Sequence, residues 1–204
     1  MSVRISGHKI VLRDMQLGDV AAYSHWMQPG HEWQRLDGPY YGHPSAEQVA
    51  QQVERVRARI ERAEWPDPRE RLMIAAQPDD AFIGMVTWYW ISEETHWPAV
   101  GILIYDPARW RQGLGYEALG LWSDYLFRVM PRFARLDLRT WSGNYGMMGL
   151  ALKLGYMEEA RFRRARIVDG NYYDGLGYGV LRDEWAARYP DGFAAHLDHL
   201  NGAG

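Results

Sequence analysis

The chain has 204 residues, of which 47% are hydrophobic and 24% charged, and its formal net charge is −3. This ordinary globular composition gives no indication of nucleic acid or an anionic membrane as a partner. The absence of cysteine removes disulfides, thiol nucleophiles and cysteine-based metal sites. No apolar stretch reaches 18 residues and the N-terminus lacks a signal-peptide run, so we expect a cytoplasmic protein.

Hydrophobic periodicity predicts elements in the order β-α-α-β-β-β-α-β-α-β-β, followed by two helices. A capping box, Ser45-Ala-Glu-Gln48, begins the second helix, and an Asp-Gly turn joins the last two strands. The segment before the capping box, residues 28–44, is rich in glycine and proline and is expected to be a functional loop. The ranges in chain order are 8–15, 17–27, 45–64, 71–76, 81–91, 99–105, 113–129, 134–140, 145–154, 156–167, 172–181, 183–190 and 193–200.

The sequence contains no internal repeat, low-complexity tract or linker. We therefore expect one mixed α/β domain over residues 1–204. Its core is expected over about 8–186, with a short helical C-terminal tail at 187–204.

The most informative stretch is Gly113-Leu-Gly115-Tyr-Glu-Ala118, between a predicted strand and a predicted helix. Glycines at such a turn let backbone N–H groups approach an anion, and the helix N-terminus adds partial positive charge. Arg109 and Arg111 flank the turn and can contact a phosphate. A helix start without any ligand is the competing interpretation.

A dinucleotide-binding Rossmann turn fits this stretch poorly. Residues 106–112 separate the preceding strand from Gly113, whereas that fold runs its strand almost directly into the first glycine. The residue at the distance of the acidic ribose ligand is Asp137, which lies mid-strand and is expected to face solvent. No Gly-Lys-Ser/Thr is present, which excludes a Walker loop.

The pattern W-x-x-G-x-G-x-E-A-L, which starts at Trp110, resembles the acetyl-CoA loop of the GNAT superfamily of N-acetyltransferases. Within it, the ribosomal-protein N-terminal acetyltransferase branch is the nearest match. Asn144, eleven residues before Gly155-Tyr156, matches the next helix of that family. The C-terminal hairpin and tail match through Gly170, Asp174, Tyr178, Leu181 and Glu184-Trp185, so the resemblance covers most of residues 8–186.

The resemblance implies a GNAT fold, a single mixed and mostly antiparallel sheet with splayed central strands, here 99–105 and 134–140, flanked by helices. It implies acetyl-CoA as co-substrate, with the pantetheine arm between these strands and the pyrophosphate on the glycine turn. The sequence gives no case for a metal. The implied cofactor-binding residues are Leu103, Ile104, Tyr105, Trp110, Arg111, Gln112, Gly113, Leu114, Gly115, Tyr116 and Asn144.

The implied reaction is direct acetyl transfer to a primary amine, with a backbone N–H near Ile104 or Tyr105 as oxyanion donor. The chain departs from the family at the general acid, because Met147 and Ala151 occupy the usual Ser and Tyr positions. Ala99 likewise replaces an acidic residue that is often found before the glycine of the splayed strand. Tyr145, Tyr156 or water is the substitute acid. The candidate bases are Glu93, Glu94 and His96.

The acceptor pocket is expected between loop 28–44, the strand 81–91 and the final hairpin. Its predicted aromatic walls are Trp33, Tyr40, Tyr41, Trp88 and Trp90, with Glu32 or Asp37 attracting a cationic amine. A protein N-terminus, an amino sugar, a polyamine and a small metabolite all stay open as acceptor.

The missing acids keep two alternatives open: a non-catalytic module that binds or senses acyl-CoA, and an enzyme with another acyl donor. The arginines at 161–166 are explained by one solvated strand face, so nucleic acid is not expected as a partner. A monomer and a homodimer are both compatible with the sequence.

Overall fold

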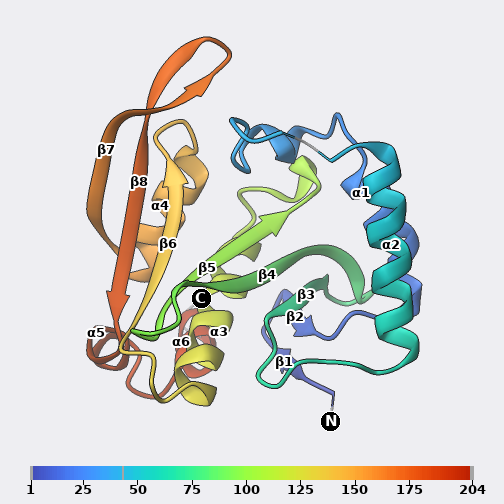
Figure 1. Ribbon diagram of the computed structural model, residues 1–204. Coiled ribbons are helices and arrows are strands. Elements are labelled where there is room, and N and C mark those ends of the chain that lie inside the picture. The colour runs from blue at the N-terminus through green and yellow to red at the C-terminus, as the bar shows by residue number, and fades with distance from the viewer. Residues whose placement is uncertain (1, 43, 203–204) are drawn as a thin grey trace.

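The computed structural model describes residues 2–42 and 44–202, so residue 43 of the predicted loop and residues 203–204 of the predicted tail lie outside it. Eight strands form one sheet in the order β1-β2-β3-β4-β5-β6-β8-β7 (Figure 1). The strands are β1 Arg4–Ser6, β2 Ile10–Arg13, β3 Arg71–Ala76, β4 Ala81–Ser92, β5 Trp97–Ile104, β6 Arg135–Trp141, β7 Met157–Val168 and β8 Asn171–Leu181.

Within the described ranges, six α-helices and three short 3-10 segments connect and cover the strands. The helices are α1 Val20–Met27, α2 Ala46–Glu61, α3 Leu114–Val129, α4 Tyr145–Leu154, α5 Arg182–Arg188 and α6 Phe193–Gly202. The 3-10 segments are η1 Leu17–Asp19, η2 Glu32–Arg35 and η3 Pro107–Arg109. No helix of the described residues is long and apolar enough to cross a membrane.

The predicted order of elements is confirmed, with one addition. β1 pairs antiparallel with β2 but has only three residues, too few to show a period in the sequence. The capping box of α2 forms as expected: the Ser45 hydroxyl accepts from the Gln48 N–H at 3.2 Å, and the Gln48 side chain accepts from the Ser45 N–H at 2.7 Å. The mixed, mostly antiparallel sheet of the predicted fold class is also confirmed.

The two central strands, β5 and β6, pair in parallel over only two positions, Ala99 with Asp137 and Val100 with Leu138. Both strands continue past this point, so they diverge toward their C-terminal ends, as Figure 1 shows. Parallel strands that separate leave the facing N–H and C=O groups of both edges without their ladder partners. The splay expected from the resemblance is therefore present.

Each face of the sheet carries its own hydrophobic core. One contains Leu136, Leu138 and the buried side of α3 and also reaches α5 and α6. The other joins β3 and β4 to α1 and α2. Figure 1 shows α1 and α2 on one side of the diverging strands and the β6–β8–β7 group on the other. The opening between β5 and β6 is thus held from both sides by packed layers.

Asp137 corrects one expectation. Its side chain is buried, because it accepts from the Nε of Arg135 at 2.7 Å and from the Nη2 of Arg139 at 3.3 Å. Alternation of apolar and charged residues along β6 predicted a solvated face. That face is instead covered by its own ion pairs and by the Trp97 ring, which lies 5.6 Å from the Arg139 guanidinium.

Candidate active site

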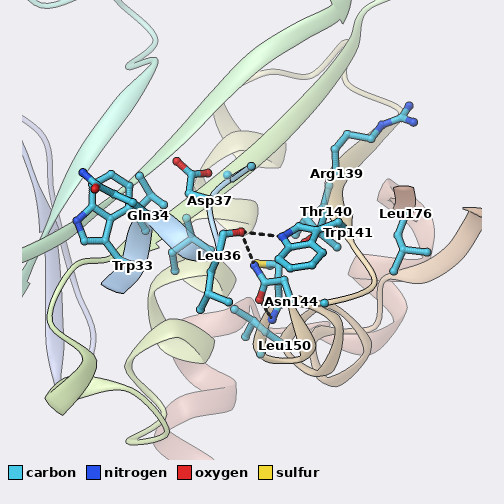
Figure 2. A pocket seen from close by; sticks show the side chains of 18 of the residues that line it. Trp33, Gln34, Leu36, Asp37, Arg139, Thr140, Trp141, Asn144, Leu150 and Leu176 are labelled. Atoms are coloured by element: carbon cyan, nitrogen blue, oxygen red, sulfur yellow. Dashed lines mark hydrogen bonds between the residues drawn. The ribbon is translucent and has the colours of Figure 1, made fainter. Parts of the chain in front are cut away.

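A cleft of about 860 Å³ opens where β5 and β6 diverge. Most of its walls come from four segments: the end of β5 with the turn to α3, the end of β6 with the start of α4, the connection between α1 and α2, and the β7–β8 hairpin. Figure 2 looks into this cleft and shows Leu36 of the α1–α2 connection facing Trp141 and Asn144 at the end of β6 and the start of α4.

The turn before α3 has the backbone geometry of an anion site. Gly113, the residue before the helix, has a φ of 84°, and Arg111 also lies in the left-handed region with a φ of 60°. Left-handed residues between right-handed ones turn successive N–H groups to one side, which forms an anion-binding nest. No side chain caps α3, so in this described segment the amides of the first turn lack an intrahelical or side-chain acceptor.

Trp110 fastens this turn to the end of β5. Its indole N–H donates to the Ile104 carbonyl at 2.9 Å. The Asp106 carboxylate accepts from the Ala108 N–H at 2.9 Å, and the Gln112 side chain donates to the Ala108 carbonyl at 2.7 Å. The side chains of Trp110 and Gln112 therefore shape the turn, and its backbone is left to meet a ligand.

The glutamate of the E-A-L motif has a structural role. The buried Glu117 carboxylate accepts from the N–H groups of Lys9 and Ile10 at 2.8 and 3.0 Å, which ties α3 to β2. A Cβ on Gly7 would lie 2.0 Å from this carboxylate, so a larger residue there would displace Glu117 from its two N–H donors. The motif thus combines a ligand-facing turn with a fixed helix.

Fewer backbone groups of β5 face the gap than the resemblance implied. The Tyr105 N–H donates to the Ile83 carbonyl at 3.0 Å, which makes that position a hydrogen-bonded pair with β4. In an antiparallel ladder such pairs alternate, so Leu103 also bonds toward β4, and Ile102 and Ile104 turn their backbone groups into the gap. The expectation that the Tyr105 N–H is an oxyanion donor is therefore wrong, because β4 has taken it.

The turn from β6 into α4 is held by side-chain hydrogen bonds to protein groups. The Asn144 side chain accepts from the Met147 N–H at 3.0 Å, which caps α4, and donates to the Leu36 carbonyl at 3.2 Å. The Trp141 indole donates to the same carbonyl at 3.1 Å. Figure 2 shows the bonds from Asn144 and Trp141 meeting at the Leu36 carbonyl. They hold the α1–α2 connection across the cleft.

The two candidate acids lie in very different places. The Tyr145 side chain lines the cleft and is 76% exposed at the first position of α4. Tyr156 is buried away from the cleft, with its hydroxyl 2.8 Å from the Ser123 hydroxyl. Burial raises the pKa of Tyr156 well above its ordinary value. Tyr156 is therefore unsuited to proton transfer in the cleft, and Tyr145 stays a candidate.

Glu93, Glu94 and His96 lie in the turn between β4 and β5, at the opposite end of β5 from Ile104. Eight residues of extended strand separate His96 from Ile104, roughly 26 Å at 3.3 Å per residue. None of the three lines the cleft. The expected bases are misplaced because they precede the part of β5 that pairs with β6, and the splay begins only after Val100.

Trp88 and Trp90 also face away from the cleft. They pack edge-to-face against each other and against Phe133, on the α3 side of the sheet, and the Trp88 indole donates to the Arg69 carbonyl at 2.9 Å. Side chains alternate along a strand, so the residue between them, Tyr89, lines the cleft instead. The prediction that Trp88 and Trp90 line the cleft is therefore wrong, because the opposite face of β4 meets it.

The α1–α2 connection supplies the aromatic wall that was predicted from it. Trp33, Tyr40 and Tyr41 line the cleft, and Asp37 does so as well, whereas Glu32 does not. The Tyr40 and Tyr41 rings lie 4.8 Å apart, and the Arg166 guanidinium lies 4.5 Å from the Tyr40 ring centroid. Burial raises the pKa of Tyr40, so this phenol stays protonated at neutral pH.

Five cleft features escaped the sequence analysis: the Leu36 carbonyl and the side chains of Trp141, Tyr89, Arg139 and Arg166. The Leu36 carbonyl was missed because a backbone carbonyl carries no sequence signal. Trp141 was missed because its pattern is that of an apolar residue at the end of a strand. The strand parity of Tyr89 was the only available signal for that residue. The described residues contain no group of three or more His, Cys, Asp or Glu side chains that could hold a metal ion.

Comparison with known proteins agrees with this geometry. A family model for the acetyltransferase (GNAT) domain matches residues 9–157. The SPbeta prophage-derived uncharacterized N-acetyltransferase YokL of Bacillus subtilis (strain 168) is 24% identical over 126 residues, which are 60% of this chain and 70% of YokL.

Solved structures share the fold at lower identity. A GNAT-family acetyltransferase from Bacillus anthracis has a TM-score of 0.69 and 15% identity, with 89% of this chain and 99% of that chain covered. RimL, a ribosomal L7/L12 α-N-protein acetyltransferase in complex with coenzyme A, has a TM-score of 0.67 and 17% identity over 89% of this chain and 99% of its own.

Proposed function

The chain belongs to the GNAT acetyltransferase family, and from this premise we propose that it transfers the acetyl group of acetyl-CoA to a primary amine in the cleft between β5 and β6. The observation that carries the proposal is the uncapped, left-handed turn before α3 at the mouth of splayed strands. A protein that bound no ligand there would leave these backbone groups with water alone.

The α3 turn is the proposed site for the pyrophosphate. The amides from Arg111 to Tyr116 surround the position, the α3 N-terminus contributes its partial positive charge, and Arg111 adds a guanidinium. The pantetheine arm then lies along the backbone of Ile102 and Ile104, as a peptide adds to a sheet edge. Asn144 borders the arm from α4 and retains one N–H and one lone pair for it.

In the proposed reaction the neutral amine nitrogen attacks the thioester carbonyl carbon, the C–S bond breaks, the new amide nitrogen releases a proton to water, and the thiolate takes a proton. The Ile104 N–H faces the gap and donates to the developing oxyanion. Asp37 lines the acceptor side and attracts the amine as its cation before the proton is lost to water. Tyr145, at the cleft mouth, is the proposed donor to the thiolate, with water as the alternative donor.

The acceptor class is a separate part of the proposal. RimL acts on the N-terminus of a ribosomal protein, and a protein N-terminus or a small amine would both present a primary amine here. The cytoplasm, where acetyl-CoA is supplied, is the proposed compartment.

A second candidate is a module that binds acyl-CoA without turnover. Met147 and Ala151 favour it, because neither can donate a proton at the positions where the family places its acid. The two candidates share the cofactor site and differ only in turnover.

Thiol release from acetyl-CoA with a panel of primary amines distinguishes them. The proposed enzyme releases coenzyme A in an amine-dependent reaction, and a binding module binds acetyl-CoA in calorimetry with no amine-dependent release. Absence of binding by any CoA thioester would contradict both. Tyr145→Phe tests the acid: kcat should fall about a hundredfold or more if Tyr145 protonates the thiolate, and should be unchanged if water does.

A further inference from the structure

Two arginines lie flat on the part of the sheet that forms the far wall of the cleft. A Cβ on Gly175 would lie 3.7 Å from the Nε of Arg166, and a Cβ on Gly177 would lie 3.2 Å from an Nη of Arg139. The two glycines are two residues apart on β8, so they share one face of the sheet. Glycine has no side chain, so the guanidinium groups of Arg166 on β7 and Arg139 on β6 fill the space over these two positions.

A bulge in β7 brings Arg166 to this place. Phe162 pairs with Gly175 and Arg166 with Tyr173, so four steps along β7 match two along β8. Arg164 in the bulge has a φ of 55°, and its N–H donates to the Asp174 carboxylate at 2.9 Å. Bulges of this kind re-aim side chains next to functional sites. Here Phe162 and Arg166 both line the cleft.

The positive charge on this wall is only partly balanced. Arg139 shares the Asp137 carboxylate at 3.3 Å with Arg135, which holds it more closely at 2.6 Å. Among the described residues Arg166 makes no ion pair with a carboxylate; its Nη1 donates to the Ala165 carbonyl at 3.2 Å, and its buried Nε has no hydrogen-bond acceptor. The Nε is covered by protein, but Arg166 lines the cleft and its charge is not neutralised by a carboxylate, so its Nη groups are the donors that an anion in the cleft can meet.

We propose that the amine acceptor also carries a carboxylate, which Arg166 binds with Arg139 beside it. This inference rests on the proposed function and names the acceptor class of the same cleft. A guanidinium fixed against the Tyr40 ring offers a planar pair of donors that matches a carboxylate. Asp37 on the α1–α2 connection holds the amine end, so the cleft complements an amino acid with opposite charges at its two ends.

A free amino acid and a peptide whose N-terminal residue is followed by an acidic side chain both carry this chemistry. We favour the free amino acid, because Tyr40 and Arg166 contact each other across the cleft and limit its length. A panel of ω-amino acids from glycine to 6-aminohexanoate, each with its carboxamide, measures the preference. Ala-Glu and Ala-Gln dipeptide amides form the peptide arm.

The measured quantity is the ratio of kcat/KM for each acid to that for its carboxamide. We expect a ratio of about ten or more for at least one chain length, and an Arg166→Met variant should lower it about ten- to a hundredfold, since a hydrogen-bonded charge is lost. Arg163→Met, which removes a β7 arginine that does not line the cleft, is the matched control and should leave the ratio unchanged.

Ratios near one for every chain length, or equal ratios in wild type and Arg166→Met, would overturn the inference and leave amine acetylation standing. A preference confined to the Ala-Glu dipeptide would assign the carboxylate to a peptide. If no amine is acetylated, the proposed function fails. Calorimetry of the same acids with the CoA-saturated protein then decides the inference: no binding, or binding that Arg166→Met does not weaken, contradicts it.

Discussion

The two turns that lead from the splayed strands into helices are built in opposite ways. Before α4, Asn144 caps the helix and Leu36 accepts from both Asn144 and Trp141. Before α3, no side chain caps the helix, and two residues adopt left-handed backbone. The α4 turn is satisfied by protein and holds a loop, whereas the α3 turn keeps its backbone donors for an anion.

The largest effect is expected from Gly113→Val, which places a β-branched residue at a φ of 84°. The strained turn should misdirect its N–H groups and lower CoA affinity by tenfold to a hundredfold, measured by calorimetry. Gly149→Ala is the matched control. Gly149 lies in α4, and a Cβ there would meet no other atom within 4 Å, so this variant should leave the affinity unchanged. Wild-type affinity in a folded Gly113→Val protein would contradict the anion role of this turn.

Glu117→Gln tests whether the α3 turn depends on a fixed helix. The variant should lose about 1–3 kcal/mol of unfolding free energy, because the Oε1 that accepts both N–H groups loses its negative charge and the new amide NH2 is a buried donor. For a chain of this length that corresponds to a fall in Tm of roughly 2–12 °C, measured by calorimetric melting. A changed CoA affinity in the folded variant, with unchanged stability, would instead make Glu117 a ligand-binding residue.

Asn144 substitutions separate the cap from the loop contact. Asn144→Ala should cost about 1–2 kcal/mol of stability and raise the acceptor KM, since both bonds are lost. Asn144→Asp keeps the cap and loses the donor to Leu36, so it should retain most of the stability and still raise the acceptor KM. Equal acceptor KM in wild type and Asn144→Asp would show that the Leu36 contact does not shape the site.

The smallest effect concerns the far wall of the cleft and depends on pH. The Arg164 N–H and then the Arg161 side chain lower the pKa of Asp174 below its ordinary value of 3.8. A lowered folded-state pKa stabilises the protein above the unfolded pKa, and this contribution is lost as pH falls through the folded value. Urea unfolding should therefore show Asp174→Asn less stable than wild type at pH 7, with the difference shrinking below pH 3.8. A pH-independent difference would contradict this.

Local features of the site were predictable from the sequence. Gly113, Gly115, Trp110 and Asn144 act through their own turns, and short-range spacing records such turns well. The capping box of α2 and the Asp-Gly hairpin are local in the same sense, and both form. The splay of β5 and β6 came from the resemblance, and the two-position register bears it out.

Features set by long-range packing were not predictable. The segment Trp88-Tyr89-Trp90 has aromatics on both faces, so the sequence does not say which face meets the cleft. Asp137 is buried because arginines on the same strand cover it. The distance of Glu93 and His96 from the cleft depends on where β5 and β6 part, which only the sheet register reveals.

The central claim is that the α3 turn holds the pyrophosphate and the gap between β5 and β6 holds the pantetheine arm. A crystal structure of the chain with acetyl-CoA tests it most directly. The account predicts pyrophosphate oxygens within about 3 Å of the amides of residues 113–116 and the acetyl group beside the Ile104 N–H. A cofactor bound elsewhere, or a pyrophosphate that does not touch this turn, would contradict it.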